Sequence, residues 1–389
     1  MKHKYFLTFA VLVIIIIAGC SDLEEEKALE EIKCADGTTT NSCSINKPLF
    51  CDNGTLVNKS EICGCPDDFM PQNDICIEIP KCDDGTKYNE CSKDKPLYCD
   101  NGKLINNPKK CGCPKDMVLE DNTCKSKFMT DPKEIELKYV LRSKKDSIKF
   151  TVYQGLNDNL PTISRYNCNP YPCFLGKSFQ SKFIDHEKQK ELLLPLINKI
   201  KEKTSNKDDQ ARIVISLVQN IPYDYPKENL NYGDFDERYP YQVLYEMKGL
   251  CGEKSKLLVF LLRELGFGVS FLSFPDELHQ VVGIKCPDKY SVHNTGYCFI
   301  EPTEPQITTN NQIDYKGIKL TKKPEVLVIS EGLSFDSVSE EYEDAEEWNR
   351  IQDMIQYAGQ QINQRDYYIW LNLVKKYCIK TTGGECSID

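Results

Sequence analysis

The sequence predicts an α+β fold in which one apolar helix packs on an antiparallel sheet, preceded by two small disulfide-rich repeats. Three observations support this. A set of six cysteines near the start of the chain recurs 48 residues later, so that Cys34 returns as Cys82. Leucines at helical spacing follow Cys251 as far as Leu265. Three short apolar runs at 269–274, 280–285 and 297–301 then read as strands.

The chain begins like an exported lipoprotein. In residues 1–19, Lys2 and Lys4 precede an apolar run that is shorter than the about 20 residues of a membrane span. The end of this run, Ile17-Ala18-Gly19-Cys20, resembles a prokaryotic lipobox, which implies cleavage before Cys20 and lipid on its sulfur. The alternative is an uncleaved signal anchor, and both place the rest on the outer face of the cell membrane. Residues 20–33 then form an acidic tether.

Composition limits the partners. The formal net charge of −10 argues against a nucleic-acid partner, because phosphates require a basic surface. Export favours disulfides over zinc thiolates, and Asp-Gly and Asn-Gly pairs are first of all turn formers. We therefore expect no metal and no cofactor.

Because the protein is expected to be exported, most of its cysteines are expected to form disulfides. Of 20 cysteines, twelve lie in repeat 1 (34–79) and repeat 2 (80–127), where six per repeat allow 15 connectivities. Six more form close pairs in the sequence: Cys168 with Cys173, Cys286 with Cys298, and Cys378 with Cys386. With Cys20 assigned to lipid, Cys251 is the cysteine left over. A bridge from Cys251 to a distant cysteine is the usual alternative in a secreted protein, but the odd count favours a free thiol.

A globular domain is expected over 128–305, with a C-terminal extension over 306–389. We predict the following elements: strands at 135–140 and 147–152, a helix at 187–203 bent or broken at Pro195, a helix at 208–220, a loop through 238–242, the Cys251 helix, the three strands given above, a strand at 325–330 and one long acidic helix at 340–377.

The residue types around Cys251 suggest nucleophilic catalysis. A thiol in the first turn of a helix meets unpaired N–H groups, which favour the reactive thiolate. His279 follows at the mouth of one strand and Glu301 at the end of the next, so the order is nucleophile, base and orienting carboxylate. His186 and His293 are weaker candidates for the base. Asp276 and Glu277 are the alternative carboxylates.

The register of the last two strands gives a geometric expectation. If they form a hairpin, His279 opposite Glu301 and Cys286 opposite Cys298 differ in register by four residues, or about 13 Å of strand. Both pairs can share a face but cannot both be directly opposed. We expect His279 to oppose Glu301, and the disulfide to close the loop outside the regular ladder.

Taken in order, these elements resemble the transglutaminase-like superfamily, with its papain-like core of a nucleophile helix on an antiparallel sheet. The resemblance covers about 205–305 and is carried by the helix at 208–220 with its Tyr223 exit, Pro240, Leu244, Gly249-Leu250-Cys251-Gly252-Glu253, the leucines of 257–265 with Gly266-Phe267, His279-Gln280-Val281-Val282 and Ile300-Glu301-Pro302-Thr303.

The resemblance implies Cys251 as nucleophile, His279 as general base and acid, and Glu301 as the orienting carboxylate. The family usually has Asp at the last position, so the longer Glu301 needs a small backbone or rotamer adjustment. The oxyanion donors would be the Cys251 backbone N–H and a group such as Gln242 or Tyr241.

The function implied is a cell-surface cysteine enzyme that cleaves amide bonds through an acyl-thioester, with hydrolysis favoured over amine cross-linking. Its substrate would be a protein or a peptide-containing wall polymer. The alternative is a non-catalytic binding or scaffold lipoprotein with an inactive domain of this type.

Overall fold

The computed structural model describes residues 31–162, 177–228, 237–276, 279–312, 314–315, 318–320, 322–358 and 362–381. The signal segment, Cys20, Cys168, Cys173 and Cys386 lie outside these ranges. By contacts, the chain divides into two compact units, Met1–Cys111 and Gly112–Asp389. The boundary therefore falls inside repeat 2 as the sequence defines it. No helix of the described residues is long and apolar enough to cross a membrane.

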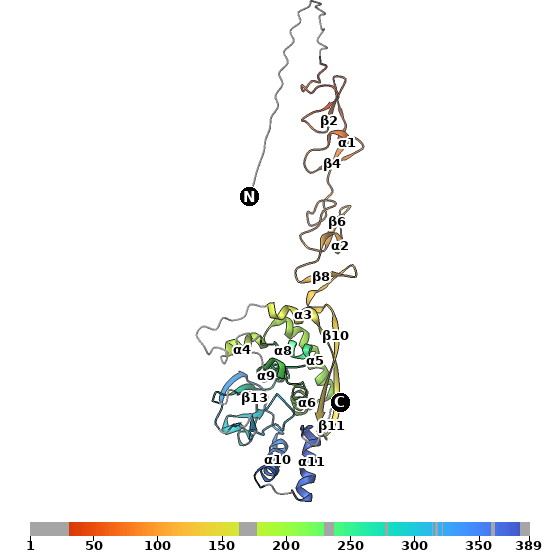
Figure 1. The fold of residues 1–389 in the computed structure, drawn as a ribbon. Coiled ribbons are helices and arrows are strands. Elements are labelled where there is room, and N and C mark those ends of the chain that lie inside the picture. Colours follow the sequence, from red (N-terminus) through yellow and green to blue (C-terminus); the bar gives the residue numbers. More distant parts are fainter. Residues whose placement is uncertain are drawn as a thin grey trace, which may run out of the picture. The chain divides into compact units, whose positions relative to one another are not determined.

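Apart from β1, which has no counterpart strand in repeat 2, the two repeats form the same short elements in the same order (Figure 1). Repeat 1 contains β1 (Ser42–Cys43), β2 (Leu49–Asp52), β3 (Thr55–Asn58), α1 (Ser60–Cys63), β4 (Phe69–Gln72) and β5 (Ile75–Glu78). Repeat 2 contains β6 (Leu97–Asp100), β7 (Lys103–Asn106), α2 (Pro108–Cys111), β8 (Met117–Glu120) and β9 (Thr123–Ser126). Few side chains are buried in either repeat besides the cysteines, so cross-links replace an apolar core.

One disulfide connectivity serves both repeats, and the sequence alone left it open. The first cysteine pairs with the third, the second with the fourth and the fifth with the sixth, as in Cys34–Cys51, Cys43–Cys63 and Cys65–Cys76. With Cys286–Cys298, seven disulfides join described residues, which indicates an extracellular or exported protein. Cys378 is also disulfide-bonded, but its predicted partner Cys386 lies outside the described residues.

After β8 and β9 of repeat 2, the second unit continues with a long hairpin followed by helices. The next elements are η1 (Lys127–Met129), β10 (Pro132–Leu141), β11 (Lys144–Tyr153), α3 (Gln154–Asn159), η2 (Leu160–Thr162), α4 (Lys177–Ile184), α5 (Glu187–Lys203), α6 (Lys207–Gln219), α7 (Tyr225–Glu228) and α8 (Pro240–Glu246). Helix α5 continues through Pro195, so of the predicted bend or break, the break does not occur. Proline inside a helix costs about 3 kcal/mol, which the fully buried Leu193, Leu196 and Ile200 offset.

The region predicted as a loop before Cys251 also differs. Pro240 begins α8, because proline is well tolerated in the first helical turn, where its missing N–H would have no partner anyway. The next elements are α9 (Cys251–Glu264), β12 (Val269–Phe274), β13 (His279–Lys285), η5 (Asp288–Tyr290), η6 (Val292–Asn294), β14 (Tyr297–Ile300), β15 (Asp314–Tyr315), β16 (Ile318–Lys319) and β17 (Glu325–Ser330).

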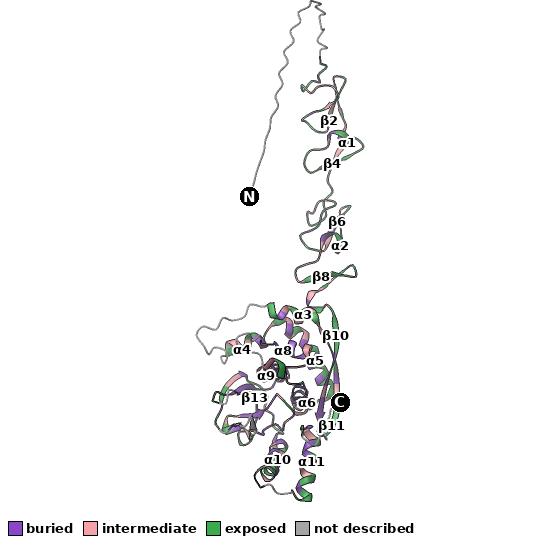
Figure 2. Cartoon of the chain, in the orientation of Figure 1, coloured by how far each residue is buried: buried purple, intermediate pink, exposed green. Residues whose placement is uncertain are grey.

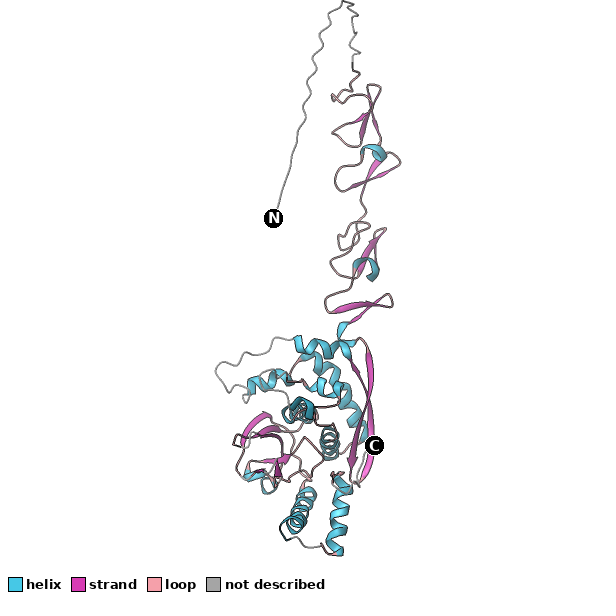
Figure 3. Cartoon of the chain, in the orientation of Figure 1, coloured by secondary structure: helices cyan, strands magenta, loops and turns pink. Residues whose placement is uncertain are grey.

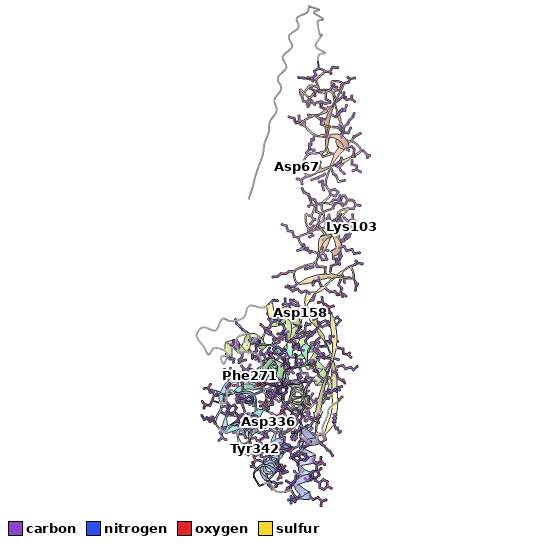
Figure 4. All side chains as sticks on the ribbon, in the orientation of Figure 1. Asp67, Lys103, Asp158, Phe271, Asp336 and Tyr342 are labelled. Carbon is purple, nitrogen blue, oxygen red and sulfur yellow. A yellow bond between two sulfur atoms is a disulfide. The ribbon has the colours of Figure 1, made fainter. Side chains whose placement is uncertain are left out.

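Strands β14, β13, β12 and β17 form one antiparallel sheet in that order (Figure 3). Helix α9 packs on β12 and β13 on one side and on α6 and α8 on the other. Figure 2 shows buried residues concentrated around α9, and Phe271 of β12, labelled in Figure 4, is fully buried there. The predicted helix on an antiparallel sheet is therefore present, and α9 is covered nearly all round.

The register of β13 and β14 corrects the expected one. Val282 opposes Ile300 and Ile284 opposes Cys298, so Glu301, by extension, falls opposite Val281, two residues from His279. Cys286 is likewise two residues from direct opposition to Cys298, yet the disulfide forms with a Cα–Cα distance of 5.7 Å. The actual register lies midway between one that would place His279 opposite Glu301 and one that would place Cys286 opposite Cys298. Both pairs are diagonal neighbours, which lie within reach of long side chains.

The C-terminal extension contains two helices where one was predicted: α10 (Ser339–Ala358) and α11 (Gln364–Tyr377). The side chain of Asn363 accepts a hydrogen bond from the Asp366 backbone N–H at 2.9 Å and so caps the start of α11. The two helices pack on each other, with Ala345, Trp348, Leu373 and Val374 in a small core of their own. An apolar pattern alone does not reveal such a reversal.

We predict that peptide mapping under non-reducing conditions will recover the first–third, second–fourth and fifth–sixth pairs from both repeats. Replacing Cys43 and Cys63 by alanine should lower the free energy of unfolding of the first unit by about 3 kcal/mol, since the pair closes a loop of roughly 20 residues. Urea unfolding of the variant and the parent measures this. A different pairing in either repeat would contradict the prediction.

Candidate active site

Cys251 is the first residue of α9 and the free cysteine of the described chain. The loop before it is held to the exit of α6: the Gly249 N–H donates to the Pro222 carbonyl, and the Gly249 carbonyl accepts from the Asp224 N–H, both at 3.2 Å. As the first helical residue, Cys251 has a backbone N–H without an intrahelical partner. Its side chain is only partly buried, so the sulfur can meet a substrate.

A buried carboxylate lies in the same helical turn and is fully compensated. Glu253 accepts hydrogen bonds from the Leu250 N–H (2.9 Å), the Arg238 N–H (2.8 Å) and the Lys227 ammonium (2.5 Å). Burial alone would raise the pKa of Glu253, but these donors hold it below its usual value. Glu253 thus closes the N-terminus of α9 as in a capping box, in which a first-turn carboxylate accepts from the N-cap backbone N–H.

His279 and Glu301 form a buried pair. The Nε2 of His279 lies 2.9 Å from Oε2 of Glu301, and the two residues are each 3% exposed. His279 also makes a side-chain hydrogen bond with Cys251. The ring therefore lies between the thiol and the carboxylate, in the order that the sequence predicts.

The electrostatics favour the charged imidazole. Burial disfavours the imidazolium, but the hydrogen bonds to Cys251 and Glu301 outweigh it and raise the pKa of His279 to about 9. The ring is therefore protonated at neutral pH. An imidazolium beside a thiol stabilises the thiolate, which is the nucleophilic form of cysteine.

Thr303 orients the carboxylate of Glu301. Its backbone N–H (2.9 Å) and its hydroxyl (2.6 Å) both donate to Oε1, which leaves Oε2 for His279. Gln219 of α6 donates to the Glu301 carbonyl at 2.9 Å and so holds the backbone of the same residue. The Glu301 side chain therefore reaches diagonally across the hairpin to His279, and Thr303 holds its Oε1 atom.

The other histidines and acids considered from sequence lie elsewhere. His186 precedes α5, and its ring centroid is 6.0 Å from that of Tyr239. His293 belongs to the η6 turn. Asp276 forms an exposed ion pair with Lys322, and Glu277 lies outside the described residues.

The two suggested oxyanion donors have other contacts. The Tyr241 hydroxyl accepts from the Tyr153 N–H at 2.6 Å and is fully buried. The side-chain oxygen Oε1 of Gln242 accepts a hydrogen bond from the Tyr239 backbone N–H at 3.1 Å. Their role at the oxyanion therefore stays a prediction without a contact to support it. The same role for the Cys251 backbone N–H also stays a prediction, although Cys251 is the first residue of α9.

An open cavity of about 800 Å³ adjoins the first turn of α9. It is lined largely by charged side chains, including Glu237, Arg238 and Asp158, the last of which is labelled in Figure 4. A Cβ on Gly252 would lie 3.3 Å from Oε1 of Glu237, so this wall of the cavity lies beside the residue that follows Cys251. Among the described residues, no cluster of His, Cys, Asp or Glu is suited to hold a metal ion.

Sequence reasoning missed two polar residues of the site. Thr303 lies two residues after Glu301, and a hydroxyl at this short spacing commonly bonds a nearby group, which was a usable signal. Lys254 shares the helical face of Leu257, Leu258 and Leu261, so a buried ammonium was predictable. Its partners were not, because they come from distant segments.

Comparison with protein-family models, with curated proteins and with solved structures gives no match for this chain. Any function inferred for it therefore rests on the residues and geometry described above.

We predict that Glu301→Gln will lower the pKa of His279 from about 9 toward its ordinary value near 6.5. The amide keeps the shape of the side chain but removes the countercharge, which leaves Cys251 as the partner that opposes the effect of burial. NMR titration of the imidazole measures this, and four histidines in the chain make assignment simple with a His279→Gln control. A midpoint that stays near 9 would show that Glu301 does not stabilise the ring.

The same pKa predicts a pH-dependent contribution to stability. The folded pKa of about 9 exceeds the unfolded value of about 6.5, so the contribution of His279 is complete below pH 6.5 and is lost as pH rises through 9. The advantage of the parent over His279→Gln in unfolding free energy should shrink by on the order of 3 kcal/mol between about pH 6 and pH 10. Urea unfolding of both proteins at each pH tests this, and a constant difference would refute it.

Proposed function

We propose that this protein is an exported cysteine acyl-transfer enzyme of the transglutaminase-like type, with Cys251 as nucleophile, His279 as acid and base, and Glu301 as the orienting carboxylate. The observation that supports the proposal is the buried imidazole that hydrogen-bonds both Cys251 and Glu301. A histidine with a purely structural role needs only one hydrogen-bond partner. A ring between a free thiol and a carboxylate is the arrangement that nucleophilic catalysis requires.

The first step forms an acyl-thioester. The Cys251 thiolate attacks an amide carbonyl, so a sulfur–carbon bond forms and the oxygen becomes an oxyanion near the N–H of Cys251. As the intermediate collapses, the carbon–nitrogen bond breaks, and the His279 imidazolium gives its proton to the leaving amine.

The second step clears the thioester. Neutral His279 takes a proton from water as the oxygen attacks the carbonyl, and the sulfur leaves as thiolate beside the re-formed imidazolium. The product is a carboxylic acid, and the starting ion pair is restored. A second amine in place of water would give a cross-link. We favour hydrolysis, because water is always available.

The substrate that we propose is a protein or a peptide-containing wall polymer outside the cell. The disulfides of the chain support an exported location. A lipid on Cys20 would hold the enzyme at the membrane, with the repeats between the anchor and the catalytic domain in the sequence.

We predict that iodoacetamide will alkylate Cys251 in the non-reduced protein at about pH 6, where an ordinary thiol with a pKa near 8.5 reacts slowly. His279→Gln should slow this alkylation about 100-fold, since the thiolate loses its imidazolium partner. Mass spectrometry locates the label, and Cys251→Ala is the control for modification elsewhere.

Labelling that needs prior reduction, or an ordinary thiol pH profile, would favour the non-catalytic scaffold. A thiol-reactive activity probe on intact cells, with a Cys251→Ala strain for comparison, tests the reaction itself. The mutant should accumulate an uncut or unlinked surface component, and its chemistry identifies the substrate class.

A further inference from the structure

Lys254 is an ammonium group buried inside the helix that carries the nucleophile. It is 0% exposed, and its Nζ donates to three backbone carbonyls: Ile221 at 2.6 Å, Thr303 at 2.6 Å and Gln219 at 3.4 Å. Three divergent acceptors match the three donors of an ammonium, which no other side chain presents from one atom. Burial lowers the pKa of Lys254 to about 7, partly offset by Glu301 and Glu304 and reinforced by Lys380.

The three carbonyls belong to segments that meet at the site. Gln219 and Ile221 lie at the C-terminal end of α6, where helix carbonyls lack intrahelical donors. Thr303 lies just after β14, a strand at one edge of the sheet. The stem of Lys254 passes over Gly249, where a Cβ would lie 3.1 Å from Cγ of the lysine. One side chain thus joins α9, the end of α6 and the loop after β14.

Thr303 connects Lys254 to the carboxylate. Its carbonyl accepts from Lys254, while its N–H and hydroxyl both donate to Oε1 of Glu301. Oε2 of Glu301 meets His279, and His279 meets Cys251, three residues before Lys254 in the same helix. The contacts therefore form a closed ring that begins and ends on α9.

We propose that Lys254 is a positioning residue, whose ammonium holds the Glu301–Thr303 loop against α9 and thereby keeps Glu301 on His279 and His279 on Cys251. The proposal rests on the function assigned above to these three residues. Lys254 itself touches no reacting atom. It acts through Thr303.

Lys254→Met tests this, because methionine has a similar length but neither charge nor donor. Loss of whatever positive charge Lys254 carries at the pH of the titration would raise the pKa of His279, whereas release of Glu301 would lower it. We expect the NMR midpoint of His279 to fall by one unit or more from about 9, and alkylation of Cys251 at about pH 6 to slow about tenfold or more.

Lys256→Met is the matched control. Lys256 lies two residues further along α9 and is 1% exposed, but its ammonium contacts Glu237 and lies 5.1 Å from the ring centroid of Phe183. This variant should lose stability, as Lys254→Met does, yet keep the parent's His279 midpoint and alkylation rate. Equal shifts in both variants would show that the loss of any buried lysine in α9 causes the effect, and would overturn the proposal.

Thr303→Val provides a test that does not require Lys254→Met to fold. It removes one of the two hydrogen bonds to Oε1 and keeps the carbonyl that Lys254 binds. The His279 midpoint should move in the same direction by a smaller amount, and an unchanged midpoint would overturn the proposal. The NMR midpoint needs no activity, so this result stays distinguishable from failure of the acyl-transfer proposal, which would show as an unreactive Cys251 in the parent protein.

Discussion

The hydrogen bond between His279 and Glu301 is the interaction on which the site depends. Burial disfavours the charged imidazole, and Cys251 together with the Glu301 carboxylate 2.9 Å away reverses this effect and raises the pKa of His279. An unpaired buried carboxylate would in turn be costly, so each partner makes the other's burial tolerable. The proposed function of Cys251 depends on this pair, because His279 interacts with both Cys251 and Glu301.

The first half of α9 is unusual in burying three charged residues in sequence positions 253–256. Glu253 binds donors from the segment before α8 and from Lys227, Lys254 binds carbonyls of α6 and the loop after β14, and Lys256 meets Glu237. Each charge ties α9 to a different segment. The second half of α9 is held by leucines, whose full burial contributes about 2 kcal/mol each. Polar contacts thus orient the end of the helix that carries Cys251, and apolar packing anchors the other end.

The repeats and the domain that follows them are stabilised by different means. The repeats bury few side chains besides their cysteines and depend on disulfides that restrict the unfolded chain. The second unit has a continuous apolar core around α9. Its Cys286–Cys298 bridge joins β13 and β14, the same strands at whose ends His279 and Glu301 lie. The hairpin that positions His279 and Glu301 is therefore cross-linked at its opposite end.

Local patterns in the sequence determined the repeats, the free thiol at Cys251, the helix it begins, and the strands that bring His279 and Glu301 near it. These features follow from period, spacing and count, which need no knowledge of distant contacts. The tertiary structure decided the rest: the disulfide connectivity, the diagonal register of His279 and Glu301, the reversal at Asn363, and the roles of Thr303 and Lys254. Each of these depends on which distant backbone groups come within hydrogen-bond or bonding distance, and that is set by how whole elements pack, not by the residues of any one segment.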